Sequence, residues 1–470
     1  MSFPTLKGRY LLSLALASAG VFAATAPAAE KLLPIPSPAK FAPPAGKIAF
    51  QDGDTLVFLG DSITSQCLST QYIEDFFYTR FPKTRLHFHN AGTVGDRAAD
   101  VLDRFEADVA AFKPKYVSVL FGMNDGGFTD WQEPVFEEFQ KNTTALLDRI
   151  GQAGATPIPM TPTLFDALPN KLSNRTQEPR DGAYNTVLKT YSAWVKEESK
   201  RRGIAVADLY APMVAATEEK RRSEADWTMI PDTMHPTPAG HVVMAAAFLN
   251  DVAFCPPVSE ILISKKNNAW QATVGNGDLA DLQGEDRVAF TYTAKSLPWV
   301  LPPEADDGRK LLPVAFKKPP ALSSELLAVR GLAPGKYELK IDGESVGQWT
   351  DTELAVGIDL GENPKTPQYQ QALKVALLNK TRTARTEHPM RIDWAALKAQ
   401  RNALKAVEQA NDNPNRIAQM QKSFATFLET NQKSISDYVA KSQEIEEAIY
   451  AINEPVARKY EVAPVAGTQP

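Results

Sequence analysis

Strands and helices alternate strictly between Thr55 and Val252, and no other feature of the sequence constrains the fold as strongly. The strand segments are short and continuously apolar, as in a sheet buried on both faces, and they begin at residues 55, 85, 116, 155 and 204. Segments with helical spacing of apolar residues lie at residues 69–81, 98–112, 134–154, 184–203 and 237–252. This alternation predicts an α/β fold, a doubly wound parallel sheet covered by helices on both faces. In such folds ligands bind beyond the carboxyl ends of the strands.

Two segments come before this unit. Residues 1–29 combine Lys7 and Arg9 with the short apolar run LLSLALASAGVFA and a stretch of small residues, the pattern of a Sec-type signal peptide. The run is too short for a spanning helix, and no later apolar run reaches that length. We therefore expect an exported protein, periplasmic or secreted, rather than an integral membrane protein. Residues 30–54 form a Pro-rich lead-in that we expect to be extended.

Two more parts follow the α/β unit, to which we assign residues 55–257. Residues 258–350 contain short strand segments separated by Gly, Asp and Pro, which predicts a small β-sandwich accessory domain. Residues 351–470 are predicted to form a helical C-terminal region. Its last segment is long and amphipathic, and we expect it to pack as a helical hairpin against one of the two domains, because such helices need tertiary contacts.

Composition argues against several classes of function. The 470 residues carry a formal net charge of −5 with dispersed basic residues, which argues against nucleic acid as the main partner. Neither the two cysteines nor the five histidines show the spacing of a metal site, so we predict neither a metal nor another cofactor. Export would permit a disulfide between Cys67 and Cys255, but inert buried thiols are the simpler interpretation.

Four polar motifs fall where a functional site is expected. Residues 60–62 (GDS) end the first strand, and the other three motifs are 90–97 (NAGTVGDR) and 122–125 (GMND), at the ends of the second and third strands, and 232–236 (DTMHP), before the last helix. Each motif taken alone is a common turn or helix cap. Because the predicted topology brings all four to one sheet edge, we expect them to form a single site.

The order and content of these motifs resemble those of the SGNH, or GDSL-type, hydrolase superfamily, and the appended parts resemble those of its exported bacterial carbohydrate-esterase-like members. The resemblance covers residues 55–252 and implies a three-layer, flavodoxin-like fold and a serine esterase. It implies that Ser62 is the nucleophile that attacks an acyl carbon. His235 would be the general base, and Asp232, three residues earlier, would fix the tautomer and orientation of the ring.

The same resemblance implies an oxyanion hole with three donors, the backbone N–H of Ser62, the N–H of Gly95 and the side chain of Asn124. Gly92 is a rival for the glycine donor, but the family's donor is the glycine three positions later. We expect Asp61 to form the turn rather than to act in catalysis. Three of the histidines are expected to be structural, namely His87, His89 and His241.

The predicted substrate follows from export and from the loops. The loops after the third and fourth strands are long and polar, with no apolar run to hold a long acyl chain. Trp131 could stack on a sugar ring and Arg97 could contact a glycan, although plain packing and a structural ion pair explain these two residues equally well. We predict removal of O-acetyl groups from an acetylated polysaccharide or oligosaccharide through an acyl-serine intermediate. A glycan O-acetyltransferase, a lipase or general carboxylesterase, and a non-catalytic polysaccharide-binding protein are the alternatives.

Overall fold

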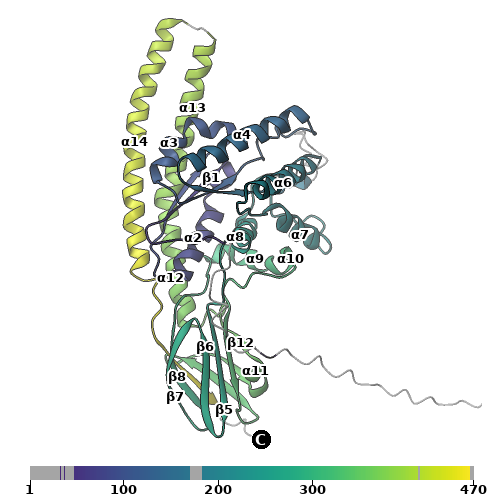
Figure 1. The fold of residues 1–470 in the computed structure, drawn as a ribbon, viewed down its shortest axis with the longest axis vertical. Helices are drawn as coiled ribbons and strands as arrows, with labels where there is room; N and C mark the ends of the chain where they lie inside the picture. The colour runs from purple at the N-terminus through teal and green to yellow at the C-terminus, as the bar shows by residue number, and fades with distance from the viewer. Residues whose placement is uncertain (1–31, 33–35, 37–46, 170–182, 411–412, 466–470) are drawn as a thin grey trace, which may run out of the picture.

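The computed structural model describes residues 32, 36, 47–169, 183–410 and 413–465. The signal peptide predicted for residues 1–29 lies outside the described residues, as does most of the Pro-rich lead-in. The described chain forms an α/β unit, a β-sandwich at one end of it and a long helical hairpin along its side (Figure 1).

The α/β unit is built on a four-stranded parallel sheet, which confirms the predicted fold class. Its strands are β1 (Thr55–Gly60), β2 (His87–Gly92), β3 (Tyr116–Leu120) and β4 (Thr156–Met160), in the order β2-β1-β3-β4. All but the first residue of each strand are buried, so both faces of the sheet are covered. Gly60 pairs with Gly92 and with Leu120, so β1, β2 and β3 end level with one another at one edge.

The fifth strand predicted over residues 204–210 is wrong. Only Ala207 pairs with the sheet, through an isolated parallel bridge to Met160. The chain leaves the sheet there because Asp208 starts a helix: its carboxylate accepts a hydrogen bond from the backbone N–H of Ala211 (3.2 Å), and α7 (Tyr210–Arg221) follows.

Four of the predicted helices are present as expected, namely α2 (Leu68–Arg80), α4 (Glu133–Gln152), α6 (Ala183–Arg202) and α8 (Pro238–Val252). The helix predicted over residues 98–112 is instead broken into η2 (Ala98–Asp103), α3 (Phe105–Asp108) and η3 (Ala110–Phe112). The backbone leaves the helical region at Arg104 (φ −123°, ψ −1°) and again at Val109 (φ −129°, ψ −65°). The buried Arg104 guanidinium lies 2.7 Å from the carboxylates of both Asp96 and Asp108, and we attribute the break to this tertiary packing rather than to the local pattern.

The β-sandwich consists of two sheets with a shared hydrophobic core. One sheet has the order β11-β10-β13-β8-β7 and the other has the order β12-β9-β5-β6. Their strands are β5 (Ser259–Lys266), β6 (Ala269–Gly275), β7 (Gly277–Gln283), β8 (Val288–Ala294), β9 (Glu325–Arg330), β10 (Lys336–Ile341), β11 (Glu344–Thr350), β12 (Ile358–Asp359) and β13 (Arg458–Pro464).

The sandwich does not match the predicted segment 258–350 in two respects. Strand β13 comes from the end of the chain, where a helix was expected, and it lies between β10 and β8. Helix α14 ends at Tyr450, and β13 begins at Arg458. Pro455 lies between them, and a proline there disfavours continuation of the helix. Residues between β8 and β9 also leave the sandwich: α9 (Asp306–Arg309) and α10 (Leu312–Ala315) pack on the α/β unit, where Trp299 and Leu301 join its core.

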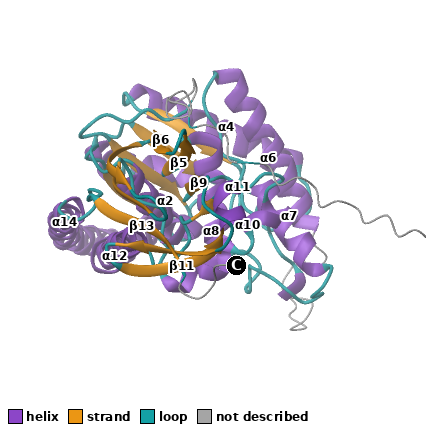
Figure 2. Cartoon of the chain, turned by 90° about the horizontal axis from the view of Figure 1, so that it is seen from below, coloured by secondary structure: helices purple, strands orange, loops and turns teal. Residues whose placement is uncertain are grey.

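The C-terminal helices are α12 (Pro367–Arg382), α13 (His388–Gln409) and α14 (Pro414–Tyr450), with a π-helical turn η5 (Thr383–Glu387) between the first two. The hairpin expected within the last segment is formed differently: that segment is the single helix α14, which pairs with α13, and the resulting hairpin lies against the α/β unit (Figure 1). Seen from below, α12 and α14 lie on the side of the molecule opposite α6 and α7 (Figure 2).

Both cysteines are free thiols, Cys67 buried and Cys255 partly buried. Within the described residues no helix has the length and apolar character needed to cross a membrane. No group of three or more His, Cys, Asp or Glu side chains in that same part of the chain has the arrangement of a metal site.

Candidate active site

The turn that carries Ser62 is fixed by the residues on either side of it. Gly60 ends β1, and a Cβ at this position would lie 2.1 Å from Thr64 Oγ1, so only glycine fits. Asp61 then caps the short helix α1 (Ser62–Ser65), because its Oδ1 accepts a hydrogen bond from the N–H of Ile63 (2.9 Å). Ser62 is therefore the first residue of a helix, and its N–H has no acceptor within that helix.

The structure brings His235 and Asp232 to this serine. Ser62 Oγ lies 2.8 Å from His235 Nε2, and His235 Nδ1 lies 2.7 Å from Asp232 Oδ2. The second carboxylate oxygen of Asp232 accepts hydrogen bonds from the backbone N–H groups of His235 (2.8 Å) and Met234 (3.2 Å). The three side chains therefore form one continuous series of hydrogen bonds.

The charge state of Asp232 determines whether this series of hydrogen bonds can accept a proton from Ser62. Burial raises the pKa of Asp232, but the hydrogen bonds from the backbone and ring of His235 outweigh that effect and hold the pKa below its ordinary value. An ionised carboxylate accepts the proton on Nδ1, which leaves Nε2 with a lone pair directed at the Ser62 hydroxyl. His235 is thus placed to take a proton from Ser62.

Two of the three predicted donors, Gly95 and Asn124, lie on adjoining loops. Gly95 has a φ of +68°, a backbone conformation that glycine adopts without cost. Its N–H donates to no other group among the described residues, whereas the N–H of its rival Gly92 already donates to Asn90 Oδ1 (2.9 Å). Asn124 Nδ2 donates to the backbone oxygen of Asp96 (2.9 Å), which ties the third motif to the loop of the second.

A buried carboxyl stands beside these donors. Asp61 Oδ2 lies 3.5 Å from Asn124 Nδ2, and burial raises the pKa of Asp61 to about 7. Asp61 caps α1 and forms the turn as expected, and its side-chain contacts are to the N–H of Ile63 and to Asn124 Nδ2 rather than to His235.

The structure places the two tentative substrate residues at the surface. The Arg97 side chain is 54% exposed, and its Nε lies 3.7 Å from Asp100 Oδ2. Trp131, in the loop before α4, is 41% exposed and also packs on Phe136, with ring centroids 4.9 Å apart. Neither contacts Ser62 or His235, so their part in substrate binding stays a prediction.

Sequence reasoning missed the groups that support the site. His241, expected only to be structural, holds the turn after Ser62: its Nδ1 accepts from the N–H of Ser69 (3.3 Å) and its Nε2 contacts Gln66 Oε1 (3.0 Å). Burial lowers the pKa of His241 to about 3, so the ring is neutral. Lys398 of α13 contacts Asp96 Oδ1 (2.6 Å) next to Gly95, and no local motif could have indicated a residue so far away in the chain.

The parallel sheet and the arrangement at its edge together define a class of enzyme, the SGNH hydrolases, in which a serine directly follows the first strand. Residues 58–243 match the model of the GDSL-like Lipase/Acylhydrolase family, so this part of the chain is similar to that family in sequence as well as in fold. The protein is accordingly a hydrolase of carboxylic esters.

Two curated proteins are similar to the α/β unit. An acetylxylan esterase of Geobacillus stearothermophilus is 26% identical over 223 residues, which cover 43% of this chain and 95% of the esterase. The uncharacterized lipoprotein YqeF of Bacillus subtilis (strain 168) is 29% identical over 164 residues, which cover 32% of this chain and 67% of the lipoprotein.

One solved structure is similar to almost the whole chain. A gut microbial diltiazem-metabolizing enzyme aligns with a TM-score of 0.73 and 27% identity, covering 89% of this chain and 99% of that enzyme. The match extends well beyond the α/β unit, so the β-sandwich and the helical region are shared as well.

Proposed function

We propose that this chain is an exported serine esterase that removes acetyl or other small acyl groups from carbohydrate through an acyl-Ser62 intermediate. The observation that carries the proposal is the unbroken series from Ser62 Oγ to His235 (2.8 Å) and from His235 to Asp232 (2.7 Å). Export rests on the signal-like N-terminus, and the small acyl group rests on the similarity to an acetylxylan esterase.

The first half of the reaction forms the acyl-enzyme. His235 Nε2 takes the hydroxyl proton while Ser62 Oγ bonds to the ester carbon, and the carbonyl electron pair moves onto oxygen. The N–H groups of Ser62 and Gly95 and the side chain of Asn124 donate to this oxyanion. The bond to the alcohol then breaks, and His235 returns the proton to the leaving oxygen.

The second half releases the acid. A water molecule loses a proton to His235 and attacks the acyl carbon, the oxyanion forms again on the same donors, and Ser62 Oγ leaves with the proton from His235. Asp232 stays ionised throughout and stabilises the positively charged ring in both halves.

The full-length structural match favours a second candidate substrate. The acetylxylan esterase corresponds to 43% of this chain, whereas the diltiazem-metabolizing enzyme corresponds to 89% of it. Diltiazem is itself an acetate ester, so a small acetylated molecule fits the same acyl group and the same chemistry without requiring a polymer.

The test compares hydrolysis of p-nitrophenyl acetate and p-nitrophenyl octanoate, with Ser62→Ala as the control. We expect acetate turnover that disappears in the variant and a much slower reaction with the octanoate. Acetylated xylooligosaccharides and diltiazem then separate the two candidate substrates. Comparable rates on both nitrophenyl esters would indicate a lipase or general esterase, and no turnover of either would favour an acetyltransferase or a binding protein.

A further inference from the structure

The helical region at the end of the chain is joined to the edge of the catalytic sheet. Strand β2 is an edge strand, and its outward N–H groups would lack partners if nothing covered them. The N–H of Asn90 donates to Glu387 Oε2 (3.0 Å) and the N–H of Phe88 donates to Glu446 Oε1 (3.4 Å). Carboxylates of the C-terminal region thus take the place of a further strand.

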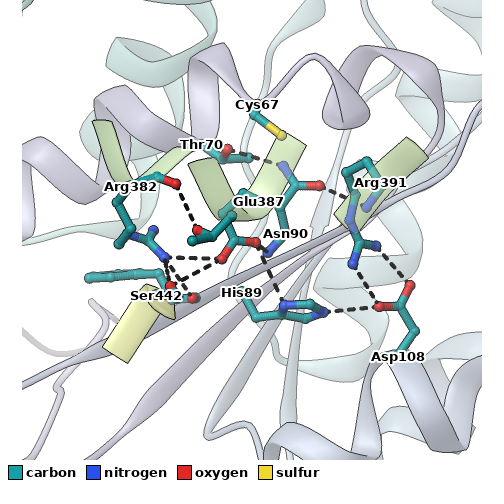
Figure 3. Close-up of polar contacts among 12 residues, drawn as sticks. Cys67, Thr70, His89, Asn90, Asp108, Arg382, Glu387, Arg391 and Ser442 are labelled. Carbon is teal, nitrogen blue, oxygen red and sulfur yellow. Dashed lines mark hydrogen bonds and ion pairs between the residues drawn. The ribbon is translucent and has the colours of Figure 1, made fainter. Parts of the chain in front are cut away.

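A second junction fixes helix α13 beside the segment that follows β2. The two terminal nitrogens of the Arg391 guanidinium, Nη1 and Nη2, donate to the Asp108 carboxylate (2.8 and 3.0 Å), as Figure 3 shows. Asp108 also accepts from Arg104 (2.7 Å) and contacts His89 (3.0 Å). Burial raises the pKa of Asp108, but the charge of Arg391, the hydrogen bond with His89 and the charge of Arg104 outweigh burial and hold that pKa below its ordinary value. The carboxylate is therefore ionised, and the junction with the two arginines is a charged one.

Two turns further along the same face of α13, Lys398 reaches the loop of the candidate oxyanion hole. Its Nζ contacts Asp96 Oδ1 (2.6 Å) and donates to the backbone oxygen of Val94 (3.3 Å). Val94 and Asp96 are the two neighbours of Gly95, and a Cβ placed on Gly95 would meet only Lys398 Nζ, at 4.0 Å. One side chain therefore holds the backbone on both sides of the proposed glycine donor.

Asp96 connects this contact to the other proposed donor. Its carboxylate is buried between Lys398 and Arg104, and its backbone oxygen accepts the hydrogen bond from Asn124 Nδ2 (2.9 Å). A shift of Asp96 would move both Gly95 and Asn124. Without Lys398 the Asp96 carboxylate would keep Arg104 as its cation, and the less neutralised charge would oppose the negative charge that develops on the ester oxygen.

We propose that Lys398 is a positioning residue for the oxyanion hole and that the α13–α14 hairpin thereby completes the active site of the hydrolase unit. The inference rests on the proposed function, because it takes Gly95 and Asn124 to be the donors. Lys398 acts through Asp96 and the loop backbone and does not contact the substrate.

The test uses the full chain and three substitutions. Lys398→Met removes the charge and the donors, and Lys398→Arg retains both. Lys405→Met is the matched control, because Lys405 is the same residue type seven positions later on α13 and pairs with Asp103, which has no contact to the candidate site. The measurements are kcat and KM for p-nitrophenyl acetate, the inhibition constant of phenylboronic acid, which forms a tetrahedral adduct with an active serine, and the thermal midpoint.

We expect Lys398→Met to lower kcat by about tenfold or more, a fraction of the 10²–10³ that loss of a whole donor costs, with KM within about twofold. The inhibition constant of the boronic acid should rise by a similar factor, since that adduct uses the same donors. Lys398→Arg should restore most of the rate, and Lys405→Met should match the parent with an equal thermal midpoint.

An active parent in which Lys398→Met and Lys405→Met behave alike would overturn the inference and leave the proposed function intact. A rise in KM with unchanged kcat would also overturn it, because that result indicates substrate binding. A parent no more active than Ser62→Ala would instead refute the proposed function. Should Lys398→Met not fold, Lys398→Gln, which keeps a donor without the charge, is judged by the same criteria.

Discussion

Replacing Asp232 by asparagine tests the roles proposed for the site with little change in shape. The amide oxygen can still accept from the backbone N–H groups of His235 and Met234, so the turn is retained. The amide nitrogen then faces His235 Nδ1, where the carboxylate oxygen lay at 2.7 Å. An NH₂ group can only donate, so the ring must carry its proton on Nε2 instead and present a donor to the Ser62 hydroxyl.

The expected decrease in kcat follows from the loss of His235 as a general base. With the wrong tautomer, His235 cannot accept the hydroxyl proton, and the effect known for this change in serine hydrolases is about 10⁴ in kcat, or about 5.4 kcal/mol. Because the Asp232 side chain is 51% exposed, water can partly take over the role of the carboxylate, and we expect a loss of about 10³–10⁴. An exposed pair of this kind contributes less than about 1 kcal/mol to folding, so the thermal midpoint should hardly change.

The assay is kcat/KM on p-nitrophenyl acetate near neutral pH, with Ser62→Ala setting the background rate and circular dichroism checking the fold. A folded Asp232→Asn enzyme that loses less than tenfold would refute the reasoning. It would mean that some other group orients His235, or that the ring needs no orienting partner.

Three further predictions concern a donor and two buried charges. Asn124→Ala should lower kcat about 10²–10³-fold with little change in KM in the same assay, and an unchanged kcat would exclude Asn124 from the oxyanion hole. Arg382→Met should lower the free energy of unfolding, measured in urea, by about 3–5 kcal/mol, because it leaves the carboxylates of Glu74 and Glu387 buried without their cation. A decrease below about 1 kcal/mol would contradict this. Burial raises the pKa of Glu325 to about 8, so the folded chain keeps a proton that the unfolded chain loses above about pH 4, and stability falls as pH rises from 5 to 8. Burial raises the pKa of Asp61, Glu74 and Asp125 into the same range, so Glu325→Gln should reduce this fall rather than remove it. At pH 9 its free energy of unfolding in urea should exceed that of the parent by about 2 kcal/mol or more, and equal pH slopes for variant and parent would count against the prediction.

The central sheet could be predicted because each of its strands is specified by a local run of residues in the sequence. Each strand is a continuous apolar run, and the alternation with helices leaves few other topologies, so the edge that carries the four motifs follows from the order of the elements. The pairing of Ser62 with His235 across 173 residues is a consequence of that topology. Position on a strand end was therefore more informative than any single motif.

The errors occur where tertiary contacts outweigh local pattern. Val101, Phe105 and Val109 are buried at the expected spacing, yet the segment is not one helix, because the backbone leaves the helical region at Arg104 and Val109. Strand β13 has no local neighbour, since both of its partners, β8 and β10, lie more than a hundred residues earlier. Its pairing depends on the helical hairpin, which returns the chain to the sandwich.

The position of β13 bears on how the hairpin can act on the site. Helix α12 follows the sandwich and β13 follows α14, so the whole helical region is held at both ends by the sandwich and along its length by Glu387, Glu446 and Arg391. A helix fixed in this way cannot slide relative to β2, and a side chain on it can define the position of a loop that lacks regular structure. The broken segment after β2 needs such a support because it has few helical hydrogen bonds of its own. We infer that the sandwich and the hairpin together hold the loop of the candidate oxyanion hole in place, through the contacts of Glu387, Glu446, Arg391 and Lys398.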